Sequence, residues 1–436
     1  MASSLKVGIA GLGTVGAALV SQITQQKEAL AARCGRPIEI VAVCARAKTK
    51  DRGIDLKKMK WFSDPVALAG APGIDVVVEL IGGAGDPAKA TVETALATGK
   101  SVVTANKALL AKHGVKLAAL AEKHNVALNF EAAVGAAIPI VKTLRDGLAG
   151  NQINRIYGIL NGTCNYILTR MEQDKLPFAE CLKEAQRLGY AEADPTFDIE
   201  GHDTAQKLAI LASLAFGTKV DESAIYVEGI SSIASADLIA ADELGYRVKL
   251  LGVAVRTPQG IEQRVHPTMV RKDSAIAQVM GVTNAVTVDA EGINPLTLVG
   301  PGAGGAATAS AVLSDIADIA RGLRVTPFGR PAALLTSVRK APMQRHEGGY
   351  YIRLQARDKP GTAATIATRL AEQEISLESI VQRHTKGAAA EAKNGSVPVI
   401  LITYATSEDA VRKALAAVGR DKVISGRPQV IRIEKN

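Results

Sequence analysis

The first third of the chain alternates short apolar runs with longer amphipathic stretches. Helical periodicity covers residues 14–35 and 87–99, and the apolar runs around them are short enough to be buried strands. Strands that alternate with helices of this length indicate βαβ units and a parallel sheet that is covered on both faces. The runs that predict strands are residues 5–13, 38–46, 74–83, 100–106 and 126–135.

From about residue 140 the pattern changes to longer helical segments mixed with separate strands, which predicts an α+β unit. A glycine-dense stretch, residues 298–322, then opens onto a further helix. A basic connector that contains prolines, residues 330–349, leads to the tail. The helices predicted for the α+β unit are residues 138–150, 178–189 and 204–217, and its strands include 153–160 and 246–256.

The tail predicts the order strand, helix, strand, strand, helix, strand, which is the ferredoxin-like βαββαβ pattern. One of its strands is predicted at residues 375–384. The expected fold class is therefore α/β, with a Rossmann-type parallel sheet, an α+β domain and a ferredoxin-like tail. The expected boundaries are 1–137 (completed by 305–340), 138–304 and 349–436.

Composition narrows the choice of partners. The chain has 436 residues, of which 47% are hydrophobic and only 3% aromatic, so Ala, Val, Leu and Ile must build the core. The net charge of +9 is modest for this length, and scarce aromatics leave few platforms for stacked bases. We therefore expect no nucleic-acid partner, and the basic excess indicates either steering of anionic ligands or plain solubility.

The cysteines indicate the redox state of the cellular compartment. Cys34, Cys44, Cys164 and Cys181 show neither a CxxC pair nor a metal-ligand spacing, which predicts free thiols under reducing conditions. Residues 7–20 look like the apolar core of a signal peptide, but their glycines fit a strand, a turn and a helix. Because no apolar run reaches the roughly 18–20 residues that a membrane helix needs, we expect a cytoplasmic protein without membrane contact.

Three glycines, Gly11, Gly13 and Gly16, directly follow the first predicted strand and begin the first helix. In this position the first glycine makes a tight turn, the second admits a pyrophosphate and the third lets helix and strand pack closely. The helix N-terminus adds N–H donors and the positive end of its dipole. We therefore predict a dinucleotide site with contacts from Ile9, Ala10, Gly11, Leu12, Gly13, Thr14, Val15 and Gly16.

The end of the second predicted strand bears on the choice of dinucleotide. An Asp or Glu is expected there when the ribose 2′-hydroxyl of NAD is bound. The chain instead has Arg46, Lys48 and Lys50, and the fork of an arginine can receive a 2′-phosphate. A solvated basic loop is the alternative. The missing acid favours NADP, with NAD also possible.

Residues 192–207, EADPTFDIEGHDTAQK, place five carboxylates ahead of one lysine, Lys207. A calcium loop, a solvated helix face and a pocket for a cationic substrate are the alternatives. An EF-hand register that begins at Thr196 puts Lys207 at position twelve, where a bidentate Glu is required, so the calcium loop is excluded. Asp203 and Lys207 are also spaced like an exposed i,i+4 pair.

The apolar stretch that follows Lys207 favours the pocket over the solvated face, because a helix that is apolar all round is buried. Burial disfavours the charged form of a lysine, whereas a carboxylate one turn away favours the charged form. The two effects could balance, and Lys207 could then both donate and accept a proton. Glu192 and Asp198 could pair with the ammonium group of a substrate.

Five stretches resemble known proteins. Residues 104–111 (TANKALLA), 130–141, 158–169 and 192–207 resemble L-homoserine dehydrogenase, and the resemblance extends from Lys6 to about Arg330. Residues 358–370 resemble the start of an ACT domain, a small module that senses amino acids. The resemblance implies NAD(P)-dependent interconversion of L-homoserine and L-aspartate 4-semialdehyde by the α+β domain, which would also make the dimer contact.

The resemblance also implies roles for single residues. Lys207 is implied to be the proton donor or acceptor, with Glu192, Asp198 and Asp203 at the substrate. Lys107 is implied to lie between cofactor and substrate. From the residues alone its role stays open: it could hold the substrate carboxylate, share the proton transfer or pair with a surface acid. The residues implied to hold a monovalent cation such as sodium are Glu131, Val134, Ala136 and Ile138. Cys164 stands where a hydroxyl residue is more usual.

For the whole protein, the resemblance implies a homo-oligomer, either a dimer or a tetramer, and threonine as an effector of the tail. Two other functions stay open from the sequence. One is another Rossmann enzyme with an ACT tail, such as a prephenate dehydrogenase, whose chemistry does not call for these carboxylates. The other is a catalytically silent amino-acid sensor, against which the presence of Lys107 and Lys207 counts.

Overall fold

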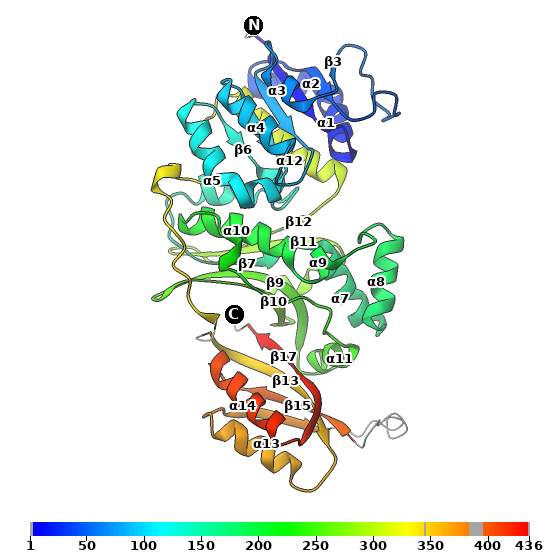
Figure 1. Cartoon of the computed structure of the whole chain (residues 1–436), viewed down its shortest axis with the longest axis vertical. Helices are drawn as coiled ribbons and strands as arrows, with labels where there is room; N and C mark the ends of the chain where they lie inside the picture. The colour runs from blue at the N-terminus through cyan, green and yellow to red at the C-terminus, as the bar shows by residue number, and fades with distance from the viewer. Residues whose placement is uncertain (1–2, 344–345, 383–395, 435–436) are drawn as a thin grey trace.

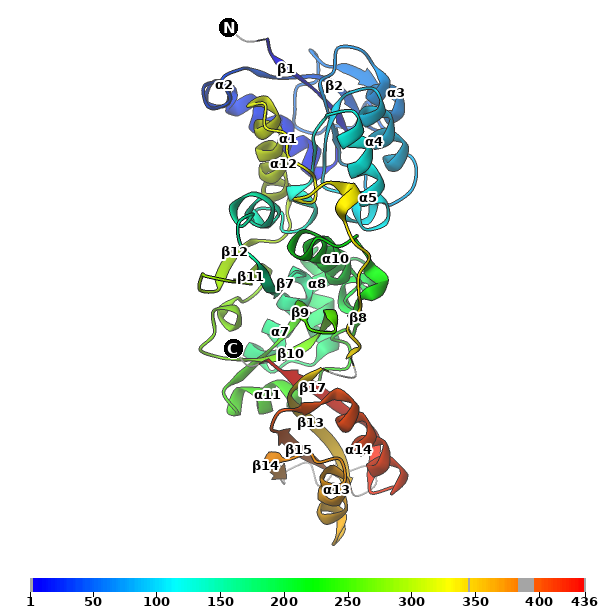
Figure 2. The ribbon, with the colours of Figure 1, turned by 90° about the vertical axis from the view of Figure 1, so that its left-hand side faces the viewer.

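Three units follow one another along the long axis of the molecule (Figures 1 and 2). The structure is a computed structural model that describes residues 3–343, 346–382 and 396–434. The N-terminal unit forms one end, the tail forms the other and the α+β unit lies between them. Within the described part of the chain, no helix is both long and apolar enough to cross a bilayer.

A six-stranded parallel sheet with the order β3-β2-β1-β4-β5-β6 forms the core of the N-terminal unit, which confirms the Rossmann-type prediction. The order reverses between β1 and β4, and ligands bind at such a switch point. The strands are β1 Leu5–Ala10, β2 Ile38–Cys44, β3 Lys60–Phe62, β4 Val76–Glu79, β5 Ser101–Thr104 and β6 Leu128–Asn129. The helices are α1 Thr14–Gln25, α2 Lys27–Cys34, α3 Pro65–Gly70, α4 Ala88–Ala97 and α5 Lys107–Lys123.

Some elements of this unit differ in extent from the sequence prediction. The helix predicted across residues 14–35 is two helices, because Gln26 leaves the helical conformation within a polar stretch that has no buried side chain. The strand predicted across 126–135 ends after Asn129, and the amide of Glu131 donates to the Asp315 side chain (2.9 Å) instead of to a strand. No hydrophobic pattern in the sequence predicted the short strand β3.

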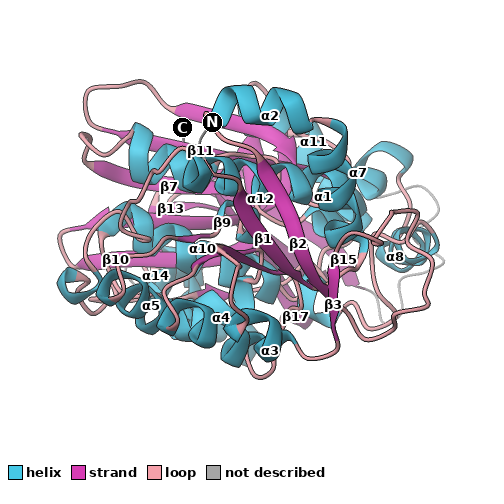
Figure 3. Cartoon of the chain, turned by 90° about the horizontal axis from the view of Figure 1, so that it is seen from above, coloured by secondary structure: helices cyan, strands magenta, loops and turns pink. Residues whose placement is uncertain are grey.

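The helix α12 (Gly305–Ala320) returns to the N-terminal unit and packs beside α1, as Figure 3 shows. Both helices contribute to one apolar cluster, in which Ala309 and Val312 of α12 meet Leu19 and Ile23 of α1. This contact joins residues 305–320 to the N-terminal unit, and the boundary at residue 340 stays a prediction.

The α+β unit contains the antiparallel strands β12-β11-β7-β9-β10. They are β7 Ile153–Ile159, β9 Tyr246–Thr257, β10 Gly260–Arg271, β11 Thr283–Ala290 and β12 Leu296–Pro301, with β8 Tyr226–Val227 beside β10. The helices are α6 Ile140–Lys142, α7 Gly162–Asp174, α8 Phe178–Arg187, α9 Thr196–Ile199, α10 His202–Phe216 and α11 Ser235–Glu243. Short 3-10 turns occur at Glu131–Ala133, Glu222–Ala224, Ala275–Gln278 and Ala332–Leu334.

The helix predicted across residues 138–150 is irregular. Only Ile140–Lys142 is α-helical, and Thr143–Gly147 continues as a π turn. Pro139 precedes the first turn, and the Glu131 carboxylate accepts the amides of Val141 and Lys142 at 2.8 Å each. The segment is therefore fixed at its start by Glu131.

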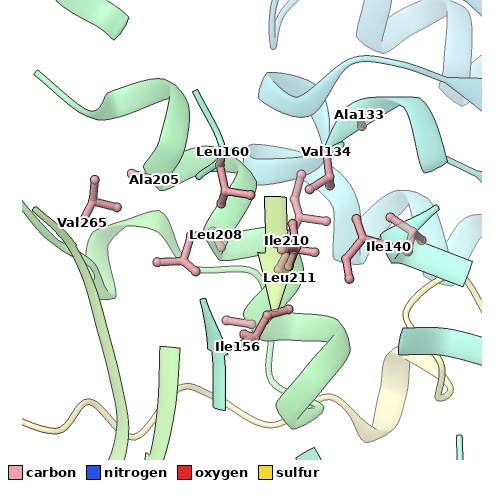
Figure 4. Close-up of a cluster of buried hydrophobic side chains, with 14 of the residues drawn as sticks. Ala133, Val134, Ile140, Ile156, Leu160, Ala205, Leu208, Ile210, Leu211 and Val265 are labelled. Carbon is pink, nitrogen blue, oxygen red and sulfur yellow. The ribbon is translucent and has the colours of Figure 1, made fainter. Parts of the chain in front are cut away.

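The helix α10 lies between the N-terminal unit and the middle sheet (Figure 1), and its apolar residues are buried on every side. This confirms the prediction that the helix which carries Lys207 is a core helix. Figure 4 shows the cluster, in which α10 contributes Ala205, Leu208, Ile210 and Leu211 and its neighbours contribute Ala133, Val134, Ile140, Ile156, Leu160 and Val265.

The tail has the predicted ferredoxin-like arrangement, with strands in the order β17-β13-β15-β14 and two helices on the sheet. Its elements are β13 Glu347–Arg357, α13 Thr362–Ala371, β14 Leu377–Gln382, β15 Ser396–Thr403, β16 Thr406–Ser407, α14 Glu408–Arg420 and β17 Ile424–Ile433. The last two residues of the strand predicted at 375–384 lie outside the described residues.

The tail is joined to the middle unit through backbone pairing. The strand β17 pairs in parallel with β10, so the two sheets form one continuous sheet. The connector before β13 is also held by backbone contacts. The amide of Lys219 donates to Thr336 and the amide of Ile261 donates to Arg339, at 2.7 and 2.8 Å. Hydrogen bonds therefore fix the position of the tail relative to the α+β unit.

Candidate active site

A cleft of about 780 Å³ lies between the N-terminal unit and the α+β unit. Val15 of the glycine motif and the start of α5 supply one wall, and residues of α7, α9, α10 and β12 supply the other. The lining therefore includes one residue of the dinucleotide motif, Val15, together with the carboxylate segment. Among the residues that line it are Val15, Lys107, Asn161, Asp198, Asp203, Lys207 and Gly300 to Gly304.

Asp203 lies at the centre of the polar cluster and is only 5% exposed. Its Oδ2 accepts from Lys207 Nζ at 2.8 Å, and its Oδ1 lies 3.1 Å from Lys107 Nζ. Asn161 Nδ2 also donates to Asp203 Oδ2, at 2.9 Å. One buried carboxylate thus holds two lysines that come from different domains of the proposed division.

The two carboxylates of the cluster have opposite pKa shifts. Burial alone would raise the pKa of Asp203, but Lys207, Lys107 and the hydrogen bonds outweigh it and lower the pKa to about 2. Burial and the neighbouring charge of Asp203 raise the pKa of Asp198. Asp203 is therefore ionised at neutral pH and keeps positive partners beside it.

Asn161 organises the cluster. It is the N-cap of α7, where its Oδ1 accepts the Cys164 amide at 2.8 Å. Its Nδ2 then bridges Asp198 (2.8 Å) and Asp203 (2.9 Å). The sequence reasoning missed this residue, although an Asn between a predicted strand and a helix is a recognisable cap.

Cys164 stands one turn into the same helix and is fully buried. Its Sγ donates to the Asp198 carbonyl at 3.2 Å. Burial and the neighbouring carboxylates raise its pKa well above the usual value for a thiol. The neutral thiol therefore makes the kind of donor contact that a hydroxyl would make.

The turn between α9 and α10 sets the spacing of the acidic residues. Gly201 is the N-cap of α10 with φ +86°, a left-handed conformation that glycine adopts without strain. It places Asp198 on one short helix and Asp203 on the next, with Lys207 one turn further along α10. The structure brings Lys107, Asp198, Asp203 and Lys207 together as the sequence predicted.

Glu192 is the exception. It is exposed, and it is not among the residues that line the cleft. Its backbone carbonyl accepts from Gln186 Nε2 at 3.1 Å. Contact between Glu192 and a substrate therefore stays a prediction.

The glycine loop has the shape that a pyrophosphate requires. Gly11 has φ +113°, and a Cβ there would lie 2.5 Å from the Leu80 carbonyl oxygen. A Cβ at Gly16 would lie 2.1 Å from the Gly11 carbonyl oxygen, whereas a Cβ at Gly13 would meet nothing within 4 Å. The first and third glycines therefore permit close packing, and the second leaves open space in front of the α1 N-terminus.

The basic loop after β2 contains one residue that the sequence reasoning overlooked. Arg46, Lys48 and Lys50 are exposed. Arg52 is directed inward, donates from Nε to the Leu12 carbonyl at 3.0 Å and packs over Trp61. It also donates to the carbonyls of Ala47 and Lys50. Arg52 thus ties the basic loop to the glycine loop.

The residues expected to hold a cation are buried, and oxygens of Glu131 and Ile138 already accept backbone amides. Both oxygens of Glu131 accept amides, and the Ile138 carbonyl accepts the Ile140 amide at 2.8 Å. Val134 and Ala136 line the cleft nearby. Within the described residues there is no group of three or more His, Cys, Asp and Glu suited to a metal ion.

Comparison with known proteins agrees with this geometry. The family models that match are "Homoserine dehydrogenase" at residues 139–317, "Homoserine dehydrogenase, NAD binding domain" at 11–131 and "ACT domain" at 350–420. The homoserine dehydrogenase of Neisseria gonorrhoeae is 44% identical, over 99% of this chain and 98% of that protein.

Solved structures give the same result. A homoserine dehydrogenase from Thiobacillus denitrificans is 41% identical with a TM-score of 0.92, over 99% of this chain and 98% of that one. A hyperthermophilic archaeal homoserine dehydrogenase in complex with NADPH is 27% identical with a TM-score of 0.63, over 74% of this chain and 99% of that one.

The parallel sheet, the glycine loop and the lysine–carboxylate cluster define a dinucleotide-dependent oxidoreductase, and the tail is an ACT domain. The chain belongs to the homoserine dehydrogenase family. This membership decides against the alternatives of a silent sensor and a prephenate dehydrogenase.

The different surroundings of Gly13 and Gly16 generate a matched pair of variants. Gly13→Ala adds a methyl group to open space, so we expect an unchanged Tm but weaker NADPH binding, because the methyl occupies the approach of the pyrophosphate. Gly16→Ala forces a methyl against the Gly11 carbonyl, so both Tm and NADPH binding should fall. Thermal unfolding and fluorescence titration with NADPH measure the two effects. Normal NADPH affinity in Gly13→Ala would contradict this assignment.

The buried pair Glu131 and Asp315 predicts how stability depends on pH. Burial raises the pKa of Glu131 from 4.5 to about 7, with Asp315 as a second cause, and burial raises the pKa of Asp315 from 3.8 to about 6. Because the folded chain binds these protons more tightly than the unfolded chain, their contribution is full below about pH 4 and is lost as pH rises through about 6 to 7.

We therefore expect Tm to fall less between about pH 5 and about pH 8 in Glu131→Gln than in the wild type. Circular dichroism at a series of pH values measures the slope. An identical slope in the two proteins would show that Glu131 does not bind its proton more tightly when folded.

Proposed function

We propose that this chain is a homoserine dehydrogenase that prefers NADP and interconverts L-homoserine and L-aspartate 4-semialdehyde. The observation that carries the proposal is the pairing of buried Asp203 with Lys207 and Lys107, in a cleft that continues to the glycine loop. In the oxidation, the alcohol carbon of homoserine loses a hydride and its oxygen loses a proton. The reverse reaction returns both to the aldehyde.

Lys207 is proposed to exchange the proton with the substrate oxygen. A lysine ammonium has three donors, and in the described structure the Asp203 carboxylate and the Leu160 carbonyl each accept one, at 2.8 Å. One donor remains for a ligand in the cleft. Asp203 keeps the charge of Lys207 compensated, and both side chains are held rigidly by burial.

Lys107 and the remaining carboxylates are proposed to bind the substrate. Lys107 is about one-third exposed (32%) with its Nζ in the cleft, so it can hold the substrate carboxylate. Asp198 lines the cleft beside Asn161 and can accept the substrate ammonium. Glu192 is proposed to face the substrate from the rim, since its side chain is exposed and Tyr190, two residues before it, lines the cleft.

NADP is proposed as the preferred dinucleotide, and it supplies or accepts the hydride when bound. Residues Ile9 to Gly16 are proposed to hold its pyrophosphate, with the open space at Gly13 as support. The β2 end has no carboxylate to bind a 2′-hydroxyl, and Arg46 is exposed beside it. A related archaeal homoserine dehydrogenase has a known complex with NADPH.

Three further properties are proposed from the resemblance. A monovalent cation such as sodium would bind at Glu131, Val134, Ala136 and Ile138, where the oxygens of Glu131 and Ile138 already accept amides. The chain would form a homo-oligomer, a dimer or a tetramer. Threonine would act on the ACT domain.

Turnover of L-homoserine with NADP, measured as NADPH absorbance, tests the function, and Lys207→Met tests the role of the lysine. The variant keeps much of the side-chain volume and removes the proton donor, so kcat should fall by about 10²–10⁴-fold. NADPH affinity should stay the same, because the glycine loop is separate from Lys207. Asp203→Asn should lower kcat less than Lys207→Met does, and it should shift the pH–rate profile, since it perturbs the lysine without deleting it.

A Lys207→Met enzyme with near-normal kcat would remove this residue from the chemistry. The proton would then have to be exchanged by Lys107 or by water. Lys107→Met separates these cases, because loss of a positioning contact raises KM for homoserine, whereas loss of a proton donor lowers kcat.

Arg46→Asp tests the cofactor preference. The substitution exchanges a contact with the 2′-phosphate for a repulsion, so KM for NADPH should rise about tenfold or more while KM for NADH changes little. Lys48→Asp is the matched control, because it makes the same charge change in the same exposed loop. Equal effects of the two substitutions, or equal effects on both cofactors, would show that Arg46 does not meet the phosphate.

A further inference from the structure

A buried arginine of the ACT domain reaches across to the α+β unit. Arg432 lies on β17, is 2% exposed and stacks over the Tyr226 ring. Its guanidinium donates to Glu408 of its own domain at 2.7 and 3.0 Å, and to Glu228 of the α+β unit at 2.6 Å. Glu228 therefore accepts the hydrogen bond by which Arg432 is joined to the α+β unit.

Glu228 begins a short segment that supports the active-site turn. The next residue, Gly229, has so little space that a Cβ would lie 2.4 Å from the Ile199 carbonyl oxygen and 2.5 Å from Glu200 Cα. The Ile230 amide donates to that same Ile199 carbonyl at 2.8 Å. The segment 228–230 is thus packed backbone against backbone on the end of α9.

The supported turn sets the geometry of the catalytic cluster. It joins α9, which carries Asp198, to α10, which carries Asp203 and Lys207. A Cβ at Gly201, the N-cap of α10, would also lie 3.0 Å from Val265 on β10. A small displacement of residues 228–230 would therefore change the relative position of Asp198 and Asp203.

We propose that Glu228, held by Arg432 of the ACT domain, is a positioning residue that sets the substrate-binding geometry of Asp198 and Asp203. The inference rests on the proposed function, because it assumes that these carboxylates face homoserine. It makes the ACT domain part of the support of the active site in the resting enzyme. A change in the domain at β17 would reach the substrate site through Arg432 and Glu228.

The test is Glu228→Gln in the full-length chain, with Asp237→Asn as the matched control. Asp237 is likewise an acid of the α+β unit that binds an ACT arginine, Arg353, at 2.6 and 3.0 Å, although Asp237 is fully buried and the Glu228 side chain is 37% exposed. It lies on α11, which packs on β9 and α7. Both substitutions remove one charge from the same interface, so both should lower Tm.

Of these two substitutions, only Glu228→Gln should raise KM for homoserine, by about three- to tenfold, with KM for NADP unchanged. Gly229→Ala should raise it further, because its methyl pushes directly on the Ile199–Glu200 backbone. An unchanged KM in Glu228→Gln, or equal KM changes in Glu228→Gln and Asp237→Asn, would overturn the inference.

Amide hydrogen exchange gives a readout that does not depend on turnover. Exchange across residues 196–203 should be faster in Glu228→Gln than in the wild type, and unchanged in Asp237→Asn. A wild type that does not turn over homoserine would refute the proposed function alone. Wild-type exchange rates in Glu228→Gln would refute the positioning role alone.

Discussion

The ion pairs of Asp203 are the constraint on which the rest of the site depends. A carboxylate that is 5% exposed stays ionised only with compensating charge, and Lys207 and Lys107 provide that charge from two sides of the cleft. The same pairs orient both lysines toward the cleft. Loss of either lysine would leave a buried negative charge with one partner fewer, so substrate geometry and local stability are linked at this residue.

The fold supplies this constraint by burying α10 completely. Leu208, Ile210 and Leu211 fix the helix in the core, so its first turn cannot shift to relieve strain among the charged groups. Asn161 adds a second fixed point, since the side chain that caps α7 also bridges Asp198 and Asp203. Two helix N-termini therefore meet at one cluster, and each is anchored by apolar packing behind it.

Patterns of local origin were readable from the sequence, whereas long-range contacts were not. Alternating strands and helices predicted the parallel sheet, and the apolar stretch after Lys207 predicted a core helix, because periodicity reports burial directly. Asn161 and Arg52 were missed because their partners are remote in sequence, Asp203 and Leu12. The exposure of Glu192 and the irregular helix after Pro139 depend on packing that no local pattern encodes.

The continuity of the sheet through β10 and β17 gives the ACT domain a structural role, beside the sensing role proposed for it. A domain attached only by a flexible linker can bind an effector without disturbing its neighbour, but here the linker is hydrogen-bonded and the sheets share a strand pair. β10 lies behind the turn that precedes α10, and Arg432 on β17 holds Glu228 beside that same turn. The structure thus provides a short physical connection between the ACT domain and the α+β unit, made of backbone pairing and one buried arginine.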